Sequence, residues 1–113
     1  MALDILYPNG QVLAVTPFGS PSSNQPDTSI TSSVASSMSN QVLLAANVDR
    51  LGATIHNDSS EHLLVKLGLV ATLTDFTVGM APASYYEVPF AYIGAISGLW
   101  LAVNGAARIT ELT

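Results

Sequence analysis

From residue 41 to residue 113 the sequence consists of short segments in which apolar and polar side chains alternate. The segments 51–55 and 76–80 show this pattern, and turn-forming residues separate such segments about every 8 to 12 positions. Alternate side chains of a β-strand point to opposite faces, so each segment can bury one face. Helical periodicity is nearly absent. We therefore predict an all-β fold, a small antiparallel β-sandwich of roughly six or seven strands, with jelly-roll, immunoglobulin-like and barrel arrangements all open.

The first 40 residues have a different composition. Between Thr16 and Asn40, nine of the 25 residues are serine and Asp27 is the single charged residue. Such a stretch has too little apolar surface to offset the entropy that it would lose by ordering on its own. We therefore predict an extended N-terminal arm over residues 1–40 and a β-sandwich module over residues 41–113. Residues 11–15 could add a strand.

Turn signals suggest how the strands of the module connect. The tetrad at 57–60, Asn-Asp-Ser-Ser, is made of residues that hydrogen-bond their own backbone in turns, and it predicts a hairpin between strands 51–56 and 63–67. Ala81-Pro82-Ala83 predicts a second turn, which leads into a strand that begins at Tyr85 and ends before Pro89. Residues 41–46 could form another strand.

The strand expected at 95–103 is apolar on both faces. Ile96, Trp100 and Ala102 lie on one side of it, and Leu99, Leu101 and Val103 lie on the other. A strand of this kind needs cover on both sides, so we expect the opposing sheet on one side and a neighbouring subunit or the arm on the other. The following Asn104-Gly105 is a strong type I′ turn signal and predicts a hairpin back into residues 107–112.

Charge limits the classes of partner. The net charge is −5, and the three basic residues, Arg50, Lys66 and Arg108, are scattered, whereas neutralising phosphates needs a basic cluster. The apolar run 90–103 is shorter than the roughly 20 residues of a membrane-spanning helix. We expect neither nucleic acid nor membrane as a partner. Since 49% of the residues are hydrophobic and 10% are charged, part of the apolar surface is expected to form an interface between copies of the chain.

Candidate metal ligands cluster around the 57–60 turn. They are His56, Asp58, Glu61 and His62, whose spacing matches no established metal motif. The chain has no cysteine, which excludes thiol chemistry, and it has no G-x-S-x-G sequence around a serine. We therefore predict no metal, no cofactor, no catalytic residues and no enzymatic activity.

Aromatic and charged residues of the second half are the best candidates for a contact surface. Adjacent tyrosines in a strand point to opposite faces, so we expect one of Tyr85 and Tyr86 in the core and the other at an interface. Paired with Arg108 or Arg50, Glu87 would form a structural ion pair, either within the chain or between subunits. An alternative is a sugar-binding platform in which Glu87 accepts from sugar hydroxyl groups and the aromatic faces are those of Tyr85, Tyr86, Phe90, Tyr92 and Trp100. The predicted interface residues are Tyr85, Tyr86, Glu87, Tyr92, Trp100 and Arg108.

Five short motifs between residues 50 and 111 resemble small virion proteins of tailed bacteriophages. In order they are R-x-x-x-x-I-x-N-x-S, L-x-V-x-L-G, Y-Y-E-V-P, Y-x-G-x-I-x-G-x-W and G-x-A-R-x-T-E. The resemblance implies a structural component of the virion, assembled in the host cytoplasm. Residues 1–40 lie outside it.

Within that class, the physical features favour a capsid cement or decoration protein. Such a protein is small, associates with itself, usually as a trimer, and clamps major capsid protein subunits, for which an arm that orders on its partner is suited. The alternative is a tail, neck, baseplate or fibre module with receptor or glycan binding.

Overall fold

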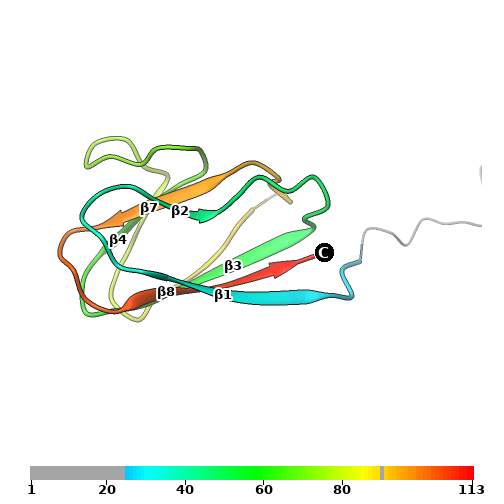
Figure 1. Cartoon of the computed structure of the whole chain (residues 1–113), viewed down its shortest axis with the longest axis horizontal. Helices are drawn as coiled ribbons and strands as arrows, with labels where there is room; N and C mark the ends of the chain where they lie inside the picture. The colour runs from blue at the N-terminus through cyan, green and yellow to red at the C-terminus, as the bar shows by residue number, and fades with distance from the viewer. Residues whose placement is uncertain (1–24, 90) are drawn as a thin grey trace, which may run out of the picture.

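The computed structural model describes residues 25–89 and 91–113, which form eight β-strands in two packed layers (Figure 1). Each layer is an antiparallel sheet of four strands, so the predicted all-β sandwich is confirmed. The strands are β1 (Ser29–Ala35), β2 (Gln41–Leu44), β3 (Gly52–Asp58), β4 (Leu63–Lys66), β5 (Val78–Met80), β6 (Tyr85–Glu87), β7 (Ile96–Trp100) and β8 (Ala106–Leu112). In this part of the chain no helix is long and apolar enough to cross a membrane.

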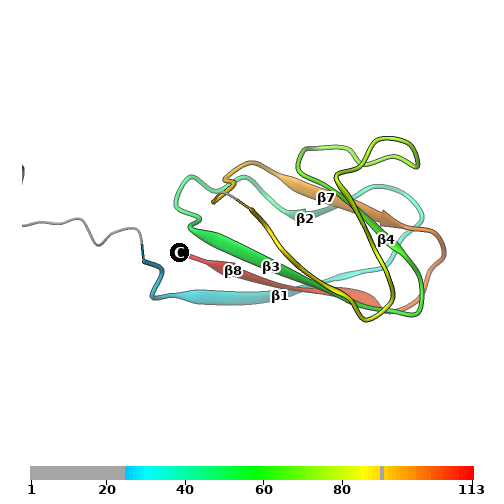
Figure 2. The same cartoon turned by 180° about the vertical axis from the view of Figure 1, so that it is seen from behind.

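The strand order decides between the alternatives left open by the sequence. Sheet A has the order β1-β8-β3-β6, and sheet B has the order β2-β7-β4-β5. Only the β4–β5 connection stays within one sheet; every other connection crosses between the layers (Figure 2). Eight strands in two sheets, connected in this way, form a jelly roll. In an immunoglobulin-like sandwich the first two strands lie in one sheet, whereas here β1 and β2 lie in different sheets, so that fold does not fit.

The boundary predicted at residue 40 is wrong for the described part of the arm. Residues 29–35 form β1, which pairs with β8 in an unbroken register from Ser29↔Leu112 to Ala35↔Ala106. Small Ser and Thr side chains and the apolar Val34 suit an edge strand whose partner is supplied by the module, a pairing that composition within 1–40 does not reveal. The strand expected at 11–15 lies outside the described residues.

Both predicted hairpins are also wrong. The turn at 57–60 takes the chain from β3 in sheet A to β4 in sheet B, and the Asn104-Gly105 turn takes it from β7 in sheet B to β8 in sheet A. Gly105 has a φ of 71°, as a turn glycine should, whereas Asn104 is not among the residues with positive φ, so the turn is not type I′. The chain reverses direction at both predicted positions, but each turn connects strands of different sheets, so the two strands do not pair with each other.

The core lies between the sheets and centres on Trp100. It includes Ile55 of β3, Leu63 and Val65 of β4, and Ile109 of β8, all of which are almost completely buried. The predicted two-sided burial of the 95–103 strand is confirmed for β7, where all five residues are buried. The second cover comes from the same chain, because Leu99 packs with Leu64 and with Ala71 of the loop 67–77. The expected neighbouring subunit or arm is not needed there.

Candidate functional site

The outer face of sheet A, which points away from sheet B, gathers most of the exposed charged and polar side chains of this sheet. The strand registers align them in two neighbouring rows across all four strands. One row consists of Thr31, Thr110, Thr54 and Glu87, and the next consists of Ser33, Arg108, His56 and Tyr85. Because a sheet presents alternate residues on one surface, a pattern spread over 80 residues of sequence becomes one flat polar surface.

Arg108 connects three strands on this face. Its Nε donates to Oδ2 of Asp58 on β3 at 2.9 Å, and one of its terminal nitrogens donates to Oγ of Ser33 on β1 at 2.9 Å. About half of each side chain of the Arg108–Asp58 pair is exposed, so water screens the attraction. The pair therefore orients the guanidinium group more than it stabilises the fold.

Tyr85 and Glu87 form the other polar contact on the face. The Tyr85 hydroxyl donates to Oε2 of Glu87 at 3.1 Å. The pKa of Tyr85 is raised, first by loss of hydration, then by this hydrogen bond and by the negative charge of Glu87, while Thr54 acts in the opposite direction. Within the chain the ion pair of Glu87 with Arg50 or Arg108 does not form, since these arginines bind Glu111 and Asp58. Such a pair between subunits stays a prediction.

The six predicted interface residues thus separate into two groups. Tyr85, Glu87 and Arg108 lie on the outer face of sheet A, as the alternation of β6 and β8 requires. Tyr86 points inward and packs against the core, which matches the expected division between the two tyrosines, and burial raises its pKa.

The other two predicted interface residues pack into or against the core. Trp100 is completely buried, and Tyr92 packs against the core with its hydroxyl donating to the Ala95 carbonyl at 3.1 Å. Trp100 therefore cannot serve as the predicted interface or as part of a sugar platform, whereas Tyr92 keeps a partly exposed surface. Phe90 lies outside the described residues. The residues that sequence reasoning missed, Thr54 and Thr110 among them, are recognisable only once the strands are placed in register.

Arg50 is the most deeply buried charge of the described chain, with 1% of its surface exposed. It donates to Oε2 of Glu111 at 2.7 Å and to the backbone carbonyls of Tyr92, Gly94 and Ala45 at 2.6 to 2.9 Å. A buried guanidinium group is tolerated when its donors are satisfied in this way. Arg50 therefore joins two loops to the last strand and has a structural role.

Asn57 is a second buried polar centre. Its side-chain amide nitrogen donates to the carbonyls of Glu61, Met80 and Ala81, and its Oδ1 accepts from the Ser59 hydroxyl and from the indole N–H of Trp100. The residue that looked like a solvated turn former is completely buried. It holds the crossing from β3 to β4 against the end of β5.

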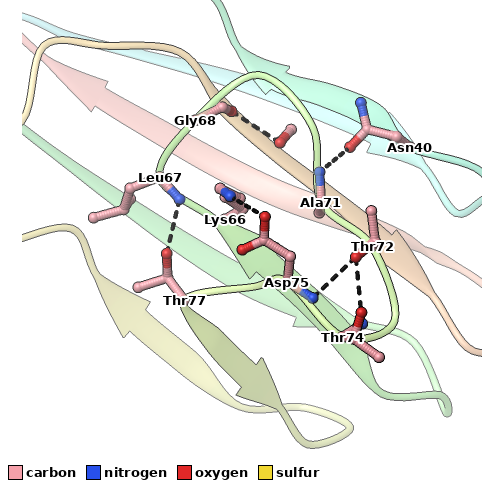
Figure 3. A network of polar contacts seen from close by, with 10 residues as sticks. Asn40, Lys66, Leu67, Gly68, Ala71, Thr72, Thr74, Asp75 and Thr77 are labelled. Atoms are coloured by element: carbon pink, nitrogen blue, oxygen red, sulfur yellow. Dashed lines mark hydrogen bonds and ion pairs between the residues drawn. The ribbon is translucent and has the colours of Figure 1, made fainter.

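The loop 67–77 lies over sheet B, and hydrogen bonds hold its backbone in place, so that it forms a platform (Figure 3). Asn40 binds it with both ends of its side-chain amide, donating to the Leu69 carbonyl at 3.1 Å and accepting from the Ala71 N–H at 2.8 Å. The Ser97 hydroxyl holds the Gly68 carbonyl at 2.9 Å, and further bonds within the loop involve Thr72, Asp75 and Thr77.

This platform presents apolar side chains to water. The exposed fractions are 71% for Leu69, 56% for Val70, 65% for Leu73 and 41% for Phe76. The backbone of the loop is fixed by the bonds just described, and none of these four side chains belongs to the hydrophobic core. An ordered loop with exposed hydrophobic residues has the character of a contact surface.

The candidate metal ligands do not assemble. Asp58 binds Arg108 on the outer face of sheet A, while His62 precedes β4 of the other sheet. Across residues 25–89 and 91–113, no three His, Cys, Asp or Glu side chains are grouped so that they could hold a metal ion.

Comparison with protein-family models, with curated proteins and with solved structures found no significant match to this chain.

Proposed function

We propose that this chain is a structural protein of a bacteriophage virion, most specifically a capsid cement or decoration protein that binds the assembled shell and has no catalytic role. The virion assignment is supported by the resemblance of residues 50–111 to small phage virion proteins. The jelly-roll fold is compatible with it, since such sandwiches occur in viral capsid proteins. Fold alone does not determine function, so the assignment depends on which surfaces can bind.

The observation that carries the proposal is the apolar platform of the loop 67–77. Leu69 and Leu73 are largely exposed, and the loop backbone is fixed before any partner arrives. A fixed apolar surface loses little conformational entropy on binding, which suits a protein that must attach to many equivalent sites on a shell. The major capsid protein is the proposed partner of this surface.

Binding to heads assembled without this protein tests the proposal. Cosedimentation should show saturable binding, and electron microscopy should show added density at threefold or quasi-threefold positions of the shell. The double variant Leu69→Ser/Leu73→Ser should lose most of this binding and keep its fold, because neither side chain contributes to the core. Thr31→Ala is a matched exposed control on the other sheet. Density at the neck or tail would contradict a cement role.

The proposed N-terminal clamp needs a shorter deletion than the sequence suggests. Removing residues 1–40 would delete β1 and the amide of Asn40 that holds the loop 67–77. Removing residues 1–24 leaves every described contact in place. We expect this shorter deletion to stay folded and to bind heads more weakly; full occupancy by the truncated protein would show that residues 1–24 are not the anchor.

The alternative is a tail, neck, baseplate or fibre module that binds a receptor or glycan. The outer face of sheet A favours it, because Tyr85 is 59% exposed, bonds to Glu87 and lies beside His56, in the same row as Arg108. An aromatic ring with flanking hydrogen-bonding groups is suited to a sugar. Binding on a glycan array that Tyr85→Ala abolishes would support this alternative over cement.

A further inference from the structure

The outer edge of β1 carries backbone groups that β8 does not use. Thr28 and Thr113 exchange two backbone hydrogen bonds, and the Ser36 N–H donates to the Gly105 carbonyl. Hydrogen-bonded and non-hydrogen-bonded pairs alternate in an antiparallel ladder, so the even-numbered residues of β1 bond to β8. The N–H and C=O groups of the odd-numbered residues therefore point away from the sheet; these residues are Ser29, Thr31, Ser33 and Ala35. Among the described strands, none pairs with this edge.

This edge has none of the usual protections against pairing. Natural sheets shield their edges with charged side chains, proline, bulges or short strands. β1 has seven residues in an unbroken register, and its sequence, SITSSVA, contains neither charge nor proline. Although the chain carries a net charge of −5, the strand itself offers no like charges that would repel a second copy.

One antiparallel register makes the edge self-complementary. If a twofold axis passes beside Ser32, then Ser29 faces Ala35 of the second copy and Thr31 faces Ser33 of the second copy. All four odd-numbered residues then form hydrogen-bonded pairs, giving about eight backbone hydrogen bonds in total. Shifting the register by two residues in either direction leaves one of these four residues without a counterpart.

The same register covers an exposed hydrophobic side chain. Ile30 lies on the sandwich side of β1 and is 60% exposed, while Val34 on that side packs against the core. The twofold arrangement places Ile30 opposite Val34 of the second copy in a non-hydrogen-bonded pair, in which cross-strand side chains approach most closely. Backbone pairing and apolar cover thus select one register.

We propose that two copies of this chain associate through β1, joining their A sheets into one continuous eight-stranded antiparallel sheet with Ser32 of both copies at the twofold axis. The contact is independent of virion attachment. It makes a twofold assembly the basic unit in place of the trimer expected for a cement protein.

A single cysteine provides a direct test, because the natural chain has none. Cα atoms of a non-hydrogen-bonded pair lie about 4.5 Å apart, which is within the range of a disulfide. Under mild oxidation, full-length Ser32→Cys should form a disulfide-linked dimer at least tenfold faster than Ser29→Cys. The Ser29→Cys control places a thiol on the same exposed strand, but the two thiols would lie about 20 Å apart along the paired strands. Equal rates would overturn the proposal.

A second measurement detects the dimer without cross-linking. Analytical ultracentrifugation of the natural chain should show a dimer that Thr31→Pro converts to a monomer. Thr31 directs its N–H away from β8, so proline there spares the β1–β8 ladder and blocks the new one. A monomeric natural chain, a trimer, or a dimer that survives Thr31→Pro would each overturn the proposal. Cross-linking of Ser32→Cys that appears only after removal of residues 1–24 would also overturn the proposal. It would mean that the β1 edge cannot pair with a second copy in the full-length chain.

Discussion

Arg50 and Glu111 form an ion pair of 2.7 Å in which the arginine side chain is fully buried and the glutamate side chain is 16% exposed. They are 61 residues apart in the sequence, and their contact joins the loop before β3 to the last strand. Three backbone carbonyls bind the remaining face of the guanidinium group. The pair therefore organises one end of the sandwich.

Removing either partner of this pair should strongly destabilise the fold. Arg50→Met leaves the carboxylate and three carbonyls without their donor, and Glu111→Gln leaves a buried guanidinium group without its counter-charge. We expect each change to lower the free energy of unfolding by about 3–5 kcal/mol, measured by urea denaturation. Arg108→Gln is the control, because its ion pair is exposed and should cost about 1 kcal/mol or less. A loss at Arg50 as small as that expected at Arg108 would contradict the structural role of Arg50.

Asn57→Ala should also be costly. It removes the donor to three carbonyls and leaves the buried indole N–H of Trp100 without its acceptor. We expect a loss of at least about 3 kcal/mol, seen in urea denaturation followed by tryptophan fluorescence. Asn47→Ala is the matched control, since its side chain accepts one bond from the Asp49 N–H near the surface. A loss at Asn57 as small as that at Asn47 would show that the buried network adds little.

Gly98 of β7 occupies a position where the neighbouring strands β2 and β4 of its own sheet leave no room for a side chain. A Cβ there would lie 2.9 Å from the Leu64 carbonyl oxygen and 3.1 Å from methyl groups of Leu43 and Leu63. Gly98→Ala should therefore cost about 1–3 kcal/mol through overpacking, measured as a fall in thermal stability. At Gly79 a Cβ would make ordinary contacts from 3.6 Å outward, so Gly79→Ala should be nearly neutral. A tolerated Gly98→Ala would mean that β4 and β7 can separate.

The amide of Asn40 should control the order of the loop 67–77. Asn40→Ala removes both bonds to the loop, while Asn40→Asp keeps the acceptor for the Ala71 N–H and loses the donor to the Leu69 carbonyl. Hydrogen exchange over residues 68–76 should be fastest in the Ala variant and intermediate in the Asp variant. Unchanged exchange in both variants would show that Ser97 and the bonds within the loop are sufficient to hold it.

Glu87→Gln should lower the pKa of Tyr85, because it removes the negative charge that disfavours the phenolate. In the natural chain the raised pKa contributes stability that is present below the unfolded value of about 10 and is lost as pH rises through the folded pKa. Carbon NMR titration of the tyrosine rings measures the change. Tyr86 is the internal control, since burial alone raises its pKa and its ring lies on the opposite face. Equal shifts of both rings would contradict a specific effect of Glu87.

The period of two in the sequence predicted the strands of the module well, because alternation reports directly which residues face a core. Phe76 to Met80, Tyr85 to Val88 and the doubly apolar 95–103 segment all contain strands of the structure. Sequence could not predict which strands pair. Turn residues such as Asn104 and Gly105 specify that the chain reverses, whereas the sheet that receives the next strand depends on packing over long separations.

The same limit explains the errors at the candidate site. Asn57 has the composition of a turn, and only the meeting of three segments around it reveals a buried hydrogen-bonding centre. Trp100 belongs to a strand that is apolar on both faces, so the sequence does not show which face meets the core. Nor does the local pattern show that Ala71 covers the opposite face, at Leu99. The polar rows on sheet A likewise require the register of β8 between β1 and β3.

The pairing of β1 with β8 also determines when this protein can fold. Ser29 can pair only after Leu112 has been synthesised, because these two residues are partners near the two ends of the described chain. Contacts between such distant residues slow folding, since a long loop must close before any of its bonds form. During synthesis on the ribosome, sheet A cannot be completed until residues 106–112 have left the exit tunnel. The nascent chain is therefore expected to complete sheet A only after the whole of β8 has been synthesised.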